Sequence, residues 1–277
     1  MAKPVDTTPV LFDRALLAMR QDRARKQGAV TFLLDRVAED FSDRLAAVKR
    51  DFSDVADLWT PGDLSLPPRA SLTRVVLDQA SETLPLQPES LDLVASALAL
   101  QFVNDLPGVL AQIRRALKPD GLLLAAMIGG DTLTELRQCF ATAEAECEGG
   151  VSPRVAPFAD LRDIGQLLQR AGLALPVTDV DRVVVRYNNA FALMHDLRRM
   201  GATNVLLERR RAPTRGATML RMAQIYAERF ADPDGRVRAT FDIVWLSAWA
   251  PHESQQKPLR PGSAKASLED AVKGMKR

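Results

Sequence analysis

The stretch SLDLVASALALQFVNDLPGVLAQIRRALKPDGLLLAAMIG, residues 90–129, decides the fold class of this chain. It begins with a mostly apolar run at residues 90–100 and ends with another at residues 121–129. Between the two, DLPGVLAQIRRALKPDG has the spacing of an amphipathic helix that ends at the Pro-Asp-Gly turn. A strand, helix, turn and strand in this order predict a right-handed crossover, with both strands side by side in the middle of an open parallel sheet.

The flanking segments extend this pattern in both directions. Residues 10–27 and 32–50 have the apolar periodicity of two helices. After residue 129, helical and strand patterns alternate up to a last strand at residues 237–250, and Asp131 is a candidate N-cap for the first of these helices. We therefore predict an α/β fold: a Rossmann-like, doubly wound, mostly parallel sheet with N-terminal helices and a helical insertion before the last strand.

Three regions follow from this pattern. Residues 1–50 are predicted to be N-terminal helices packed on the core, residues 51–250 the α/β domain, and residues 251–277 a polar C-terminal tail rich in Pro, Gly, Ser, Gln and Lys. Within the domain, RVVLD at residues 74–78 is β-branched and predicts a short strand.

Composition limits the class of protein. With 37 basic and 35 acidic residues the net charge is +2, so we expect no general attraction to nucleic acid. No apolar run reaches the length of a membrane span, and charged residues interrupt the N-terminus before a signal peptide could form. Cys139 and Cys147 lie about 12 Å apart on one predicted helix, too far for a disulfide. A cytoplasmic protein is expected, and peripheral association with a membrane is left open.

Several motifs carry a resemblance to a known family. An apolar strand, a helix and the turn LKPDG before a central strand resemble the class I S-adenosylmethionine-dependent methyltransferases. Downstream, QFVNDLP, GGDTLTELR, GGVSPRVAPF, MGATN and ATFDIVWLSAWAPHESQQKPLRPGSAKASL resemble the methyltransferase-fold assembly factor of respiratory complex I, including its α-proteobacterial relatives. The likeness covers residues 8–268 and is strongest after Leu84.

The resemblance implies a substrate class. The mitochondrial assembly factor is understood as an arginine hydroxylase that acts on an iron–sulfur subunit of complex I. A more distant relative methylates a malonyl group on a carrier protein in biotin synthesis. MIGGDTLTELRQ, residues 127–138, is more similar to the complex I branch. The partner that the resemblance implies is thus a protein chain, with a complex I subunit as the candidate, and the cofactor that it implies is S-adenosylmethionine.

The cofactor turn of this family is degraded here. The family has an acidic residue at the end of the first strand and then a G-x-G-x-G turn, where glycines let the backbone approach the ligand. In DVADLWTPGD, residues 54–63, Asp57 falls on the acidic position and Gly62 is the one glycine left, while Pro61 has no N–H to donate. Only eleven residues separate Gly62 from RVVLD, so a helix or strand is shortened or lost. If the cofactor binds, Asp57, Gly62 and Asp78 would be the remaining contacts.

Polar residues also follow the strand at residues 90–100. Gln101, Asn104 and Asp105 fall at the carboxyl edge of the sheet, where open α/β folds bind ligands, so they are candidates for the substrate side. The alternative is that Asn104 or Asp105 caps the helix that follows. No metal site is predicted, because His195 and His252 lie far apart in the sequence without a second histidine at ligand spacing.

Three functions stay open. The chain is a methyltransferase or arginine hydroxylase with an altered cofactor turn, a non-catalytic assembly scaffold that no longer binds the cofactor, or a methyltransferase acting on a small molecule or a carrier protein. Whether it is an enzyme at all is left undecided by the missing glycines.

Overall fold

The computed structural model describes residues 10–68, 70–76, 78 and 81–256. Its elements, in chain order, are α1 (Arg14–Lys26), α2 (Phe32–Ala47), β1 (Asp54–Leu58), β2 (Ser71–Val75), β3 (Leu91–Ala97), the 3-10 turn η1 (Leu100–Phe102), α3 (Leu106–Ala116), β4 (Leu117–Gly129), α4 (Thr134–Glu148), α5 (Leu161–Arg170), β5 (Ala174–Tyr187), α6 (Ala190–Arg199), α7 (Gly216–Phe230) and β6 (Val237–Trp249). Most of the predicted polar tail, from residue 257 onward, lies outside the described residues, as do residues 1–9.

One six-stranded sheet organises the chain, in the order β2-β1-β3-β4-β6-β5. The first four strands of this order are parallel, and β6 is antiparallel to both of its neighbours. It follows that β5 points the same way as the first four strands and that β6 alone is reversed. The mostly parallel sheet predicted from the sequence is confirmed.

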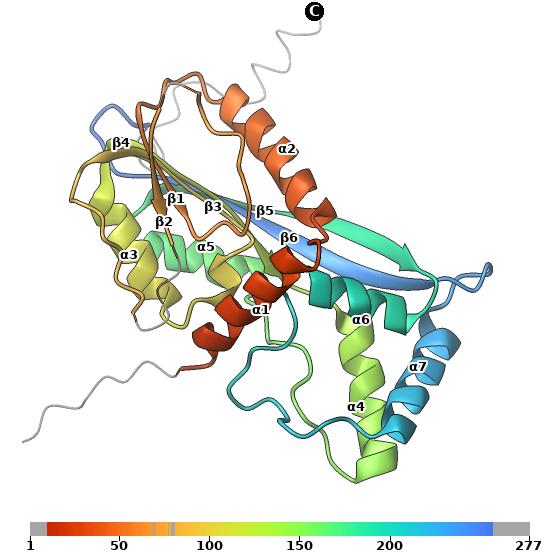
Figure 1. The fold of residues 1–277 in the computed structure, drawn as a ribbon. Coiled ribbons are helices and arrows are strands. Elements are labelled where there is room, and N and C mark those ends of the chain that lie inside the picture. The colour runs from red at the N-terminus through yellow and green to blue at the C-terminus, as the bar shows by residue number, and fades with distance from the viewer. Residues whose placement is uncertain (1–9, 69, 77, 79–80, 257–277) are drawn as a thin grey trace, which may run out of the picture.

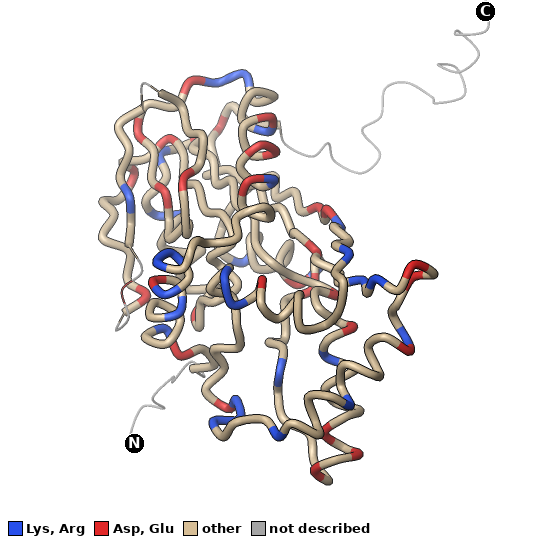
Figure 2. Tube along the Cα trace, turned by 45° about the vertical axis from the view of Figure 1, so that its right-hand side comes forward, with Lys and Arg blue, Asp and Glu red and all other residues tan. Residues whose placement is uncertain are grey.

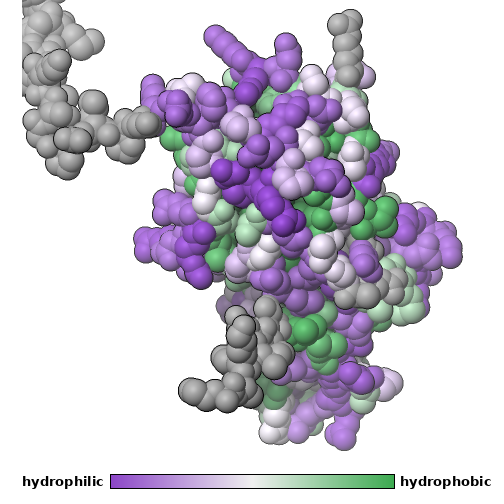
Figure 3. All heavy atoms as spheres, turned by 90° about the vertical axis from the view of Figure 1, so that its left-hand side faces the viewer, coloured by the Kyte–Doolittle hydropathy of each residue, from purple (hydrophilic) through white to green (hydrophobic). Residues whose placement is uncertain are grey.

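Helices cover both faces of this sheet (Figure 1). Side chains of α3 and α5 pack on one face, and those of α2, α4, α6 and α7 pack on the other. The predicted N-terminal helices and the helical insertion before the last strand, which is α6 and α7, are both present. Seen from the side of α3, the surface is mainly hydrophilic with small hydrophobic patches (Figure 3).

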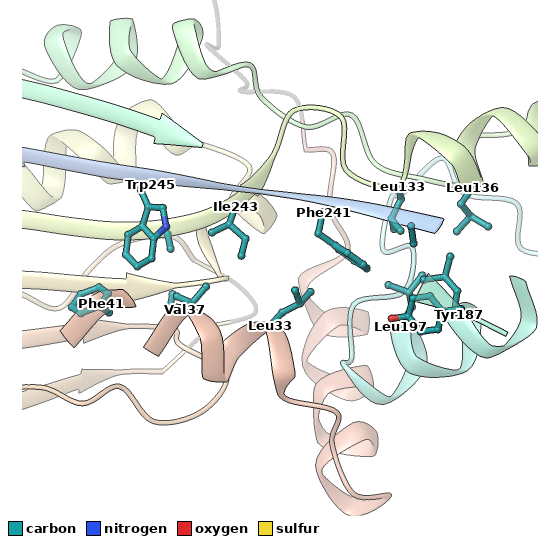
Figure 4. Close-up of a cluster of buried hydrophobic side chains, with 14 of the residues drawn as sticks. Leu33, Val37, Phe41, Leu133, Leu136, Tyr187, Leu197, Phe241, Ile243 and Trp245 are labelled. Atoms are coloured by element: carbon teal, nitrogen blue, oxygen red, sulfur yellow. The ribbon is translucent and has the colours of Figure 1, made fainter. Parts of the chain in front are cut away.

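The alternation of side chains along the strands supplies both core layers. In β4, Leu122 and Leu124 face the α2 side, while Leu123 faces the α3 side. On the α2 side, the rings of Phe41 and Trp245 lie 6.1 Å apart, both almost fully buried (Figure 4). These layers fix the carboxyl ends of β1, β3 and β4 at one edge of the sheet.

Three local predictions are wrong. The strand predicted at residues 74–78 is β2 at Ser71–Val75, because its pairing with β1 already begins opposite Asp54. The predicted turn at residues 117–121 is part of β4, paired with the start of β3. Asp131 does not cap α4: its carboxylate pairs with Arg182 at 2.8 Å, and Leu133, with φ 54°, is the residue before the helix.

Between β1 and β2 the described residues contain no helix, in line with the short spacing noted in the sequence. Cys139 and Cys147 lie on α4 as free thiols, as expected. Basic and acidic residues alternate along most of the described trace (Figure 2). Within the described part of the chain, no helix has the length and apolar character needed to cross a membrane.

Candidate functional site

A cavity of about 400 Å³ lies at the carboxyl edge of the sheet. Leu98, just after β3, and Ile128, near the end of β4, contribute to it from the sheet. The remaining walls come from the loop between α1 and α2, the start of α4, residues 154–158, the end of α6 and residues 200–210. This edge is where open α/β folds bind ligands, and the volume lies within the usual range of ligand sites, roughly 300–1,000 Å³.

Apolar side chains make up much of the wall. Leu136 lines the cavity from α4 and Leu133 from the residue just before that helix. Leu197 of α6 and Phe241 of β6 lie near them (Figure 4). Leu33 of α2 closes the same region. A ligand in this cavity would therefore bury apolar surface against these side chains.

Gln101 is the one of the six predicted site residues that lines the cavity in the described chain. Its side chain is 8% exposed and held by main-chain contacts on two sides. Nε2 donates to the carbonyl oxygen of Leu98 at 2.7 Å, and Oε1 accepts from the amide of Ile128 at 3.4 Å. Gln101 thus joins the ends of β3 and β4, and its amide has one N–H beyond the one given to Leu98.

Asn104 and Asp105 lie close by but are engaged with other parts of the backbone. Oδ1 of Asn104 accepts hydrogen bonds from the amides of Leu11 and Phe12, each at 2.8 Å. Asp105 accepts from the amide of Gly108 at 2.9 Å and so caps α3, the alternative that the sequence left open. Both residues shape the site by holding the N-terminal segment and α3 in place.

The turn after β1 is closed by its own hydrogen bonds. Asp57 is 3% exposed and accepts from Oγ1 of Thr60 at 2.5 Å. The same Oγ1 accepts from the amide of Ala97 at 3.0 Å, which bridges the ends of β1 and β3. The amide of Trp59 donates to Val75 at 3.0 Å. Burial raises the pKa of Asp57, and the hydrogen bond from Thr60 opposes this shift only in part.

Trp59 and Gly62 are explained by packing. The indole of Trp59 is buried on the α3 side of the sheet, with the guanidinium of Arg14 5.6 Å from its ring centroid. A Cβ on Gly62 would lie 2.6 Å from Cδ2 of Leu34, so the absent side chain lets the turn approach α2. Asp78 is exposed, three residues beyond the end of β2, and its charge acts on Arg14. The structure does not bring Asp57, Gly62 and Asp78 together around the cavity.

Five arginines that sequence patterns did not single out line the cavity: Arg20, Arg154, Arg198, Arg209 and Arg210. They come from four separate parts of the chain, so no local spacing could have grouped all five. The histidines lie apart, His195 exposed on α6 and His252 in the turn after β6. Among the described residues, no cluster of three His, Cys, Asp or Glu is placed to hold a metal ion.

The sheet order and the site at its carboxyl edge define a methyltransferase-type α/β protein. Residues 59–125 match the family described as Methyltransferase domain. A crystal structure of a Bacillus halodurans methyltransferase shares the fold at a TM-score of 0.50 and 16% identity, covering 76% of this chain and 96% of that one.

The chain belongs to the arginine-hydroxylase NDUFAF5 family. It is 37% identical to the mitochondrial arginine-hydroxylase NDUFAF5 of Homo sapiens over 287 aligned positions, covering 93% of this chain and 82% of that protein. The match to the Dictyostelium discoideum protein of the same name is 46% identical over 181 residues, 65% of this chain and 41% of that protein. A malonyl-[acyl-carrier protein] O-methyltransferase of Laribacter hongkongensis is 41% identical over 181 residues, 65% of this chain and 58% of that protein.

Proposed function

We propose that this chain hydroxylates an arginine side chain in a protein subunit of respiratory complex I. The observation that carries the proposal is the extent of the likeness to the human arginine-hydroxylase, which leaves less than a tenth of this chain unmatched. The match to the methyltransferase family model ends at residue 125, yet most of the cavity wall comes from residues after it. The likeness to the human protein therefore extends to the residues after 125 that form most of the cavity wall.

The partner in this proposal is a protein subunit. We propose that it binds this chain in the cytoplasm, during assembly of the membrane-bound complex. Two loops, at residues 154–158 and 200–210, form part of the cavity wall, and binding residues of proteins often lie on such loops. No part of the proposal requires a membrane-spanning helix.

S-adenosylmethionine bound in the usual turn does not fit this chain. Such a site needs free backbone N–H groups and glycines at the turn. Here the amide of Trp59 is already bonded to Val75, Pro61 has no N–H, and Gly62 packs against Leu34. The carboxylate of Asp57 is likewise engaged by Thr60. The proposed reaction converts an arginine C–H bond into C–OH. It takes one oxygen atom from O2 and two electrons from an external reductant, and the second oxygen atom leaves as water. None of these reactants is held in this turn.

Gln101 is the proposed contact for the substrate. Its amide is fixed at the floor of the cavity by Leu98 and Ile128, so it can orient a polar group of the substrate without moving. Asn104 and Asp105 are proposed to act as positioning residues, through the N-terminal segment and the start of α3. The leucines and phenylalanines of the wall exclude water from the reacting group.

The test is co-expression with complex I subunits, followed by mass spectrometry of their peptides. We expect one arginine to gain the mass of one oxygen atom with the wild-type chain. Gln101→Ala should reduce this signal about tenfold by removing the orienting amide. The matched control is Gln166→Ala, on an exposed position of α5 away from the cavity, which should leave the signal unchanged. Hydroxylation absent from every arginine would refute the proposal.

The closed turn favours a second function, a non-catalytic assembly scaffold. In that case the subunits would be recovered in complex with this chain, with no change in their peptide masses. A methyltransferase acting on a small molecule or a carrier protein would instead add the mass of one methylene group to its substrate. The same experiment, with an acyl carrier protein as an additional substrate, separates the three functions.

A further inference from the structure

The cavity is lined by five arginines and, among the described residues, by no aspartate or glutamate. Three of the arginines are neutralised by carboxylates that lie behind the wall. Arg154 donates to Glu144 through Nε at 2.8 Å, Arg209 pairs with Asp13 at 3.2 Å, and Arg210 pairs with Glu148. These three arginines have structural roles, each joining two segments of the chain.

Arg20 and Arg198 differ from the other three. The guanidinium of Arg20, on α1, donates to the carbonyl oxygen of Asn204 and forms no ion pair with a carboxylate in the described chain. The guanidinium of Arg198, on α6, likewise has no ion-pair partner among the residues that the structure places. Within the described part of the chain, these two guanidinium groups at one cavity therefore have no carboxylate within ion-pair distance.

Arg20 is also in an unfavourable position for a cation. Burial lowers its pKa, and the nearby charges of Arg209 and Arg23 lower it further, against an opposing effect of Asp13. A half-buried guanidinium beside other guanidinium groups is stabilised when an anion binds next to it. The apolar wall on the opposite side, which includes Leu136 and Phe241, suits a hydrocarbon body.

We propose that the cavity binds a small amphipathic organic anion, whose carboxylate or phosphate group faces Arg20 and Arg198 and whose apolar body lies against Leu33, Leu136 and Phe241. This goes beyond the proposed function, because it assigns the cavity a ligand other than the arginine side chain. An arginine side chain of the proposed substrate would meet like charges in this cavity, and the bound anion would supply the counter-charge that the lining lacks. A volume of about 400 Å³ suits a ligand with a short hydrocarbon chain.

The test is calorimetric titration of the full chain with four probes that share an eight-carbon chain: octanoate, octyl phosphate, octylamine and 1-octanol. We expect the two anions to bind, the neutral alcohol to bind more weakly and the amine to bind weakest. The comparison of octanoate with octyl phosphate distinguishes a carboxylate ligand from a phosphate ligand. Equal or tighter binding of octylamine would overturn the proposal.

Variants locate the site. Arg20→Gln should weaken octanoate binding roughly 10- to 100-fold, the range for loss of a hydrogen bond to a charged group. Arg198→Gln, at an exposed position, should weaken it roughly two- to fivefold. The control is Arg211→Gln, an exposed neighbour of Arg210 outside the cavity wall, which should bind as the wild type does.

Folding is controlled in the same series. Arg20→Lys keeps the charge and should retain most of the affinity, so a loss seen in Arg20→Gln alone is due to charge and not to packing. Unchanged octanoate affinity in both Gln variants would overturn the proposal. Because the readout is binding and needs no hydroxylation, failure of the proposed reaction and failure of this inference give different results.

Discussion

Replacement of Asn104 by alanine tests whether this residue acts through the structure or directly on a substrate. Its Oδ1 accepts two backbone hydrogen bonds at 2.8 Å, from Leu11 and Phe12, more than 90 positions away in the sequence. Phe12 is buried, and its ring meets that of Phe102 edge to face at a centroid distance of 6.0 Å. The Asn104 side chain therefore helps to hold residues 11 and 12 at the carboxyl edge of the sheet, together with their backbone pairing with residues 206 and 207.

The expected loss follows mainly from these two short hydrogen bonds, because the third, from Nδ2 of Asn104 to the carbonyl oxygen of Phe12, is long at 3.4 Å. Each of the two short bonds contributes about 0.5–1.5 kcal/mol, so Asn104→Ala should lower the free energy of unfolding by about 1–3 kcal/mol. The backbone amide of Asn104, which donates to Glu82 at 2.8 Å, is unaffected by the substitution. The loss should therefore come from the side chain alone.

Urea unfolding followed by circular dichroism measures this change, with Asn188→Ala as the control at an exposed position. The control should lie within about 0.5 kcal/mol of the wild type. If Asn104→Ala is equally close to the wild type, the anchoring role is refuted. If its stability is unchanged while hydroxylation is lost, Asn104 contacts the substrate.

Three further predictions concern other parts of the molecule. Burial raises the pKa of Asp242, but the hydrogen bonds and charge of Arg182 outweigh this and hold the pKa below its ordinary value. The stability from this pair is therefore present above about pH 4 and lost as the pH falls through the folded pKa, and Asp242→Asn should flatten the acid side of a plot of melting temperature against pH. If the melting temperature of Asp242→Asn falls at acid pH as steeply as that of the wild type, this prediction is wrong. Phe41→Ala, which empties the space beside Trp245, should cost about 3–5 kcal/mol in urea unfolding, and a loss below about 2 kcal/mol would mean that the core refills it. Titration with S-adenosylmethionine should give no heat of binding up to millimolar ligand, whereas micromolar binding would show that the turn after β1 opens.

Much of the fold could be predicted because its signals are local. The segment from residue 90 to 129 alternates between an apolar run, a helical period and another apolar run, and that pattern leaves little choice of architecture. The errors occurred where pairing decides the boundary. β2 begins at Ser71 because β1 offers partners there, although the β-branched run that suggested a strand starts later.

The candidate site was harder to predict. The position of Gln101 after an apolar strand identified it as a residue at the carboxyl edge, and it does line the cavity. Asn104 and Asp105 occupy the same edge and were predicted for the same reason. A position in the sequence does not show which way a side chain points or whether a backbone amide forms a hydrogen bond with it. The scarcity of glycine after β1 was visible in the sequence. The bridge that Thr60 forms between the ends of β1 and β3 was not, because Ala97 is far away in the chain.

The sequence by itself determined the α/β class, the crossover at the centre of the sheet, the resemblance to the complex I assembly factor and the scarcity of glycine after the first strand, because each depends on residues close together in the chain. Only the tertiary structure decided which charges share the cavity. Arg20 and Arg198 are far apart in the sequence, and both line the cavity because α1 and α6 lie at the same edge of the sheet. Long-range packing also decides which carboxylates pair with Arg154, Arg209 and Arg210. It leaves Arg20 and Arg198 without an ion-pair partner in the described part of the chain, and no local pattern shows this.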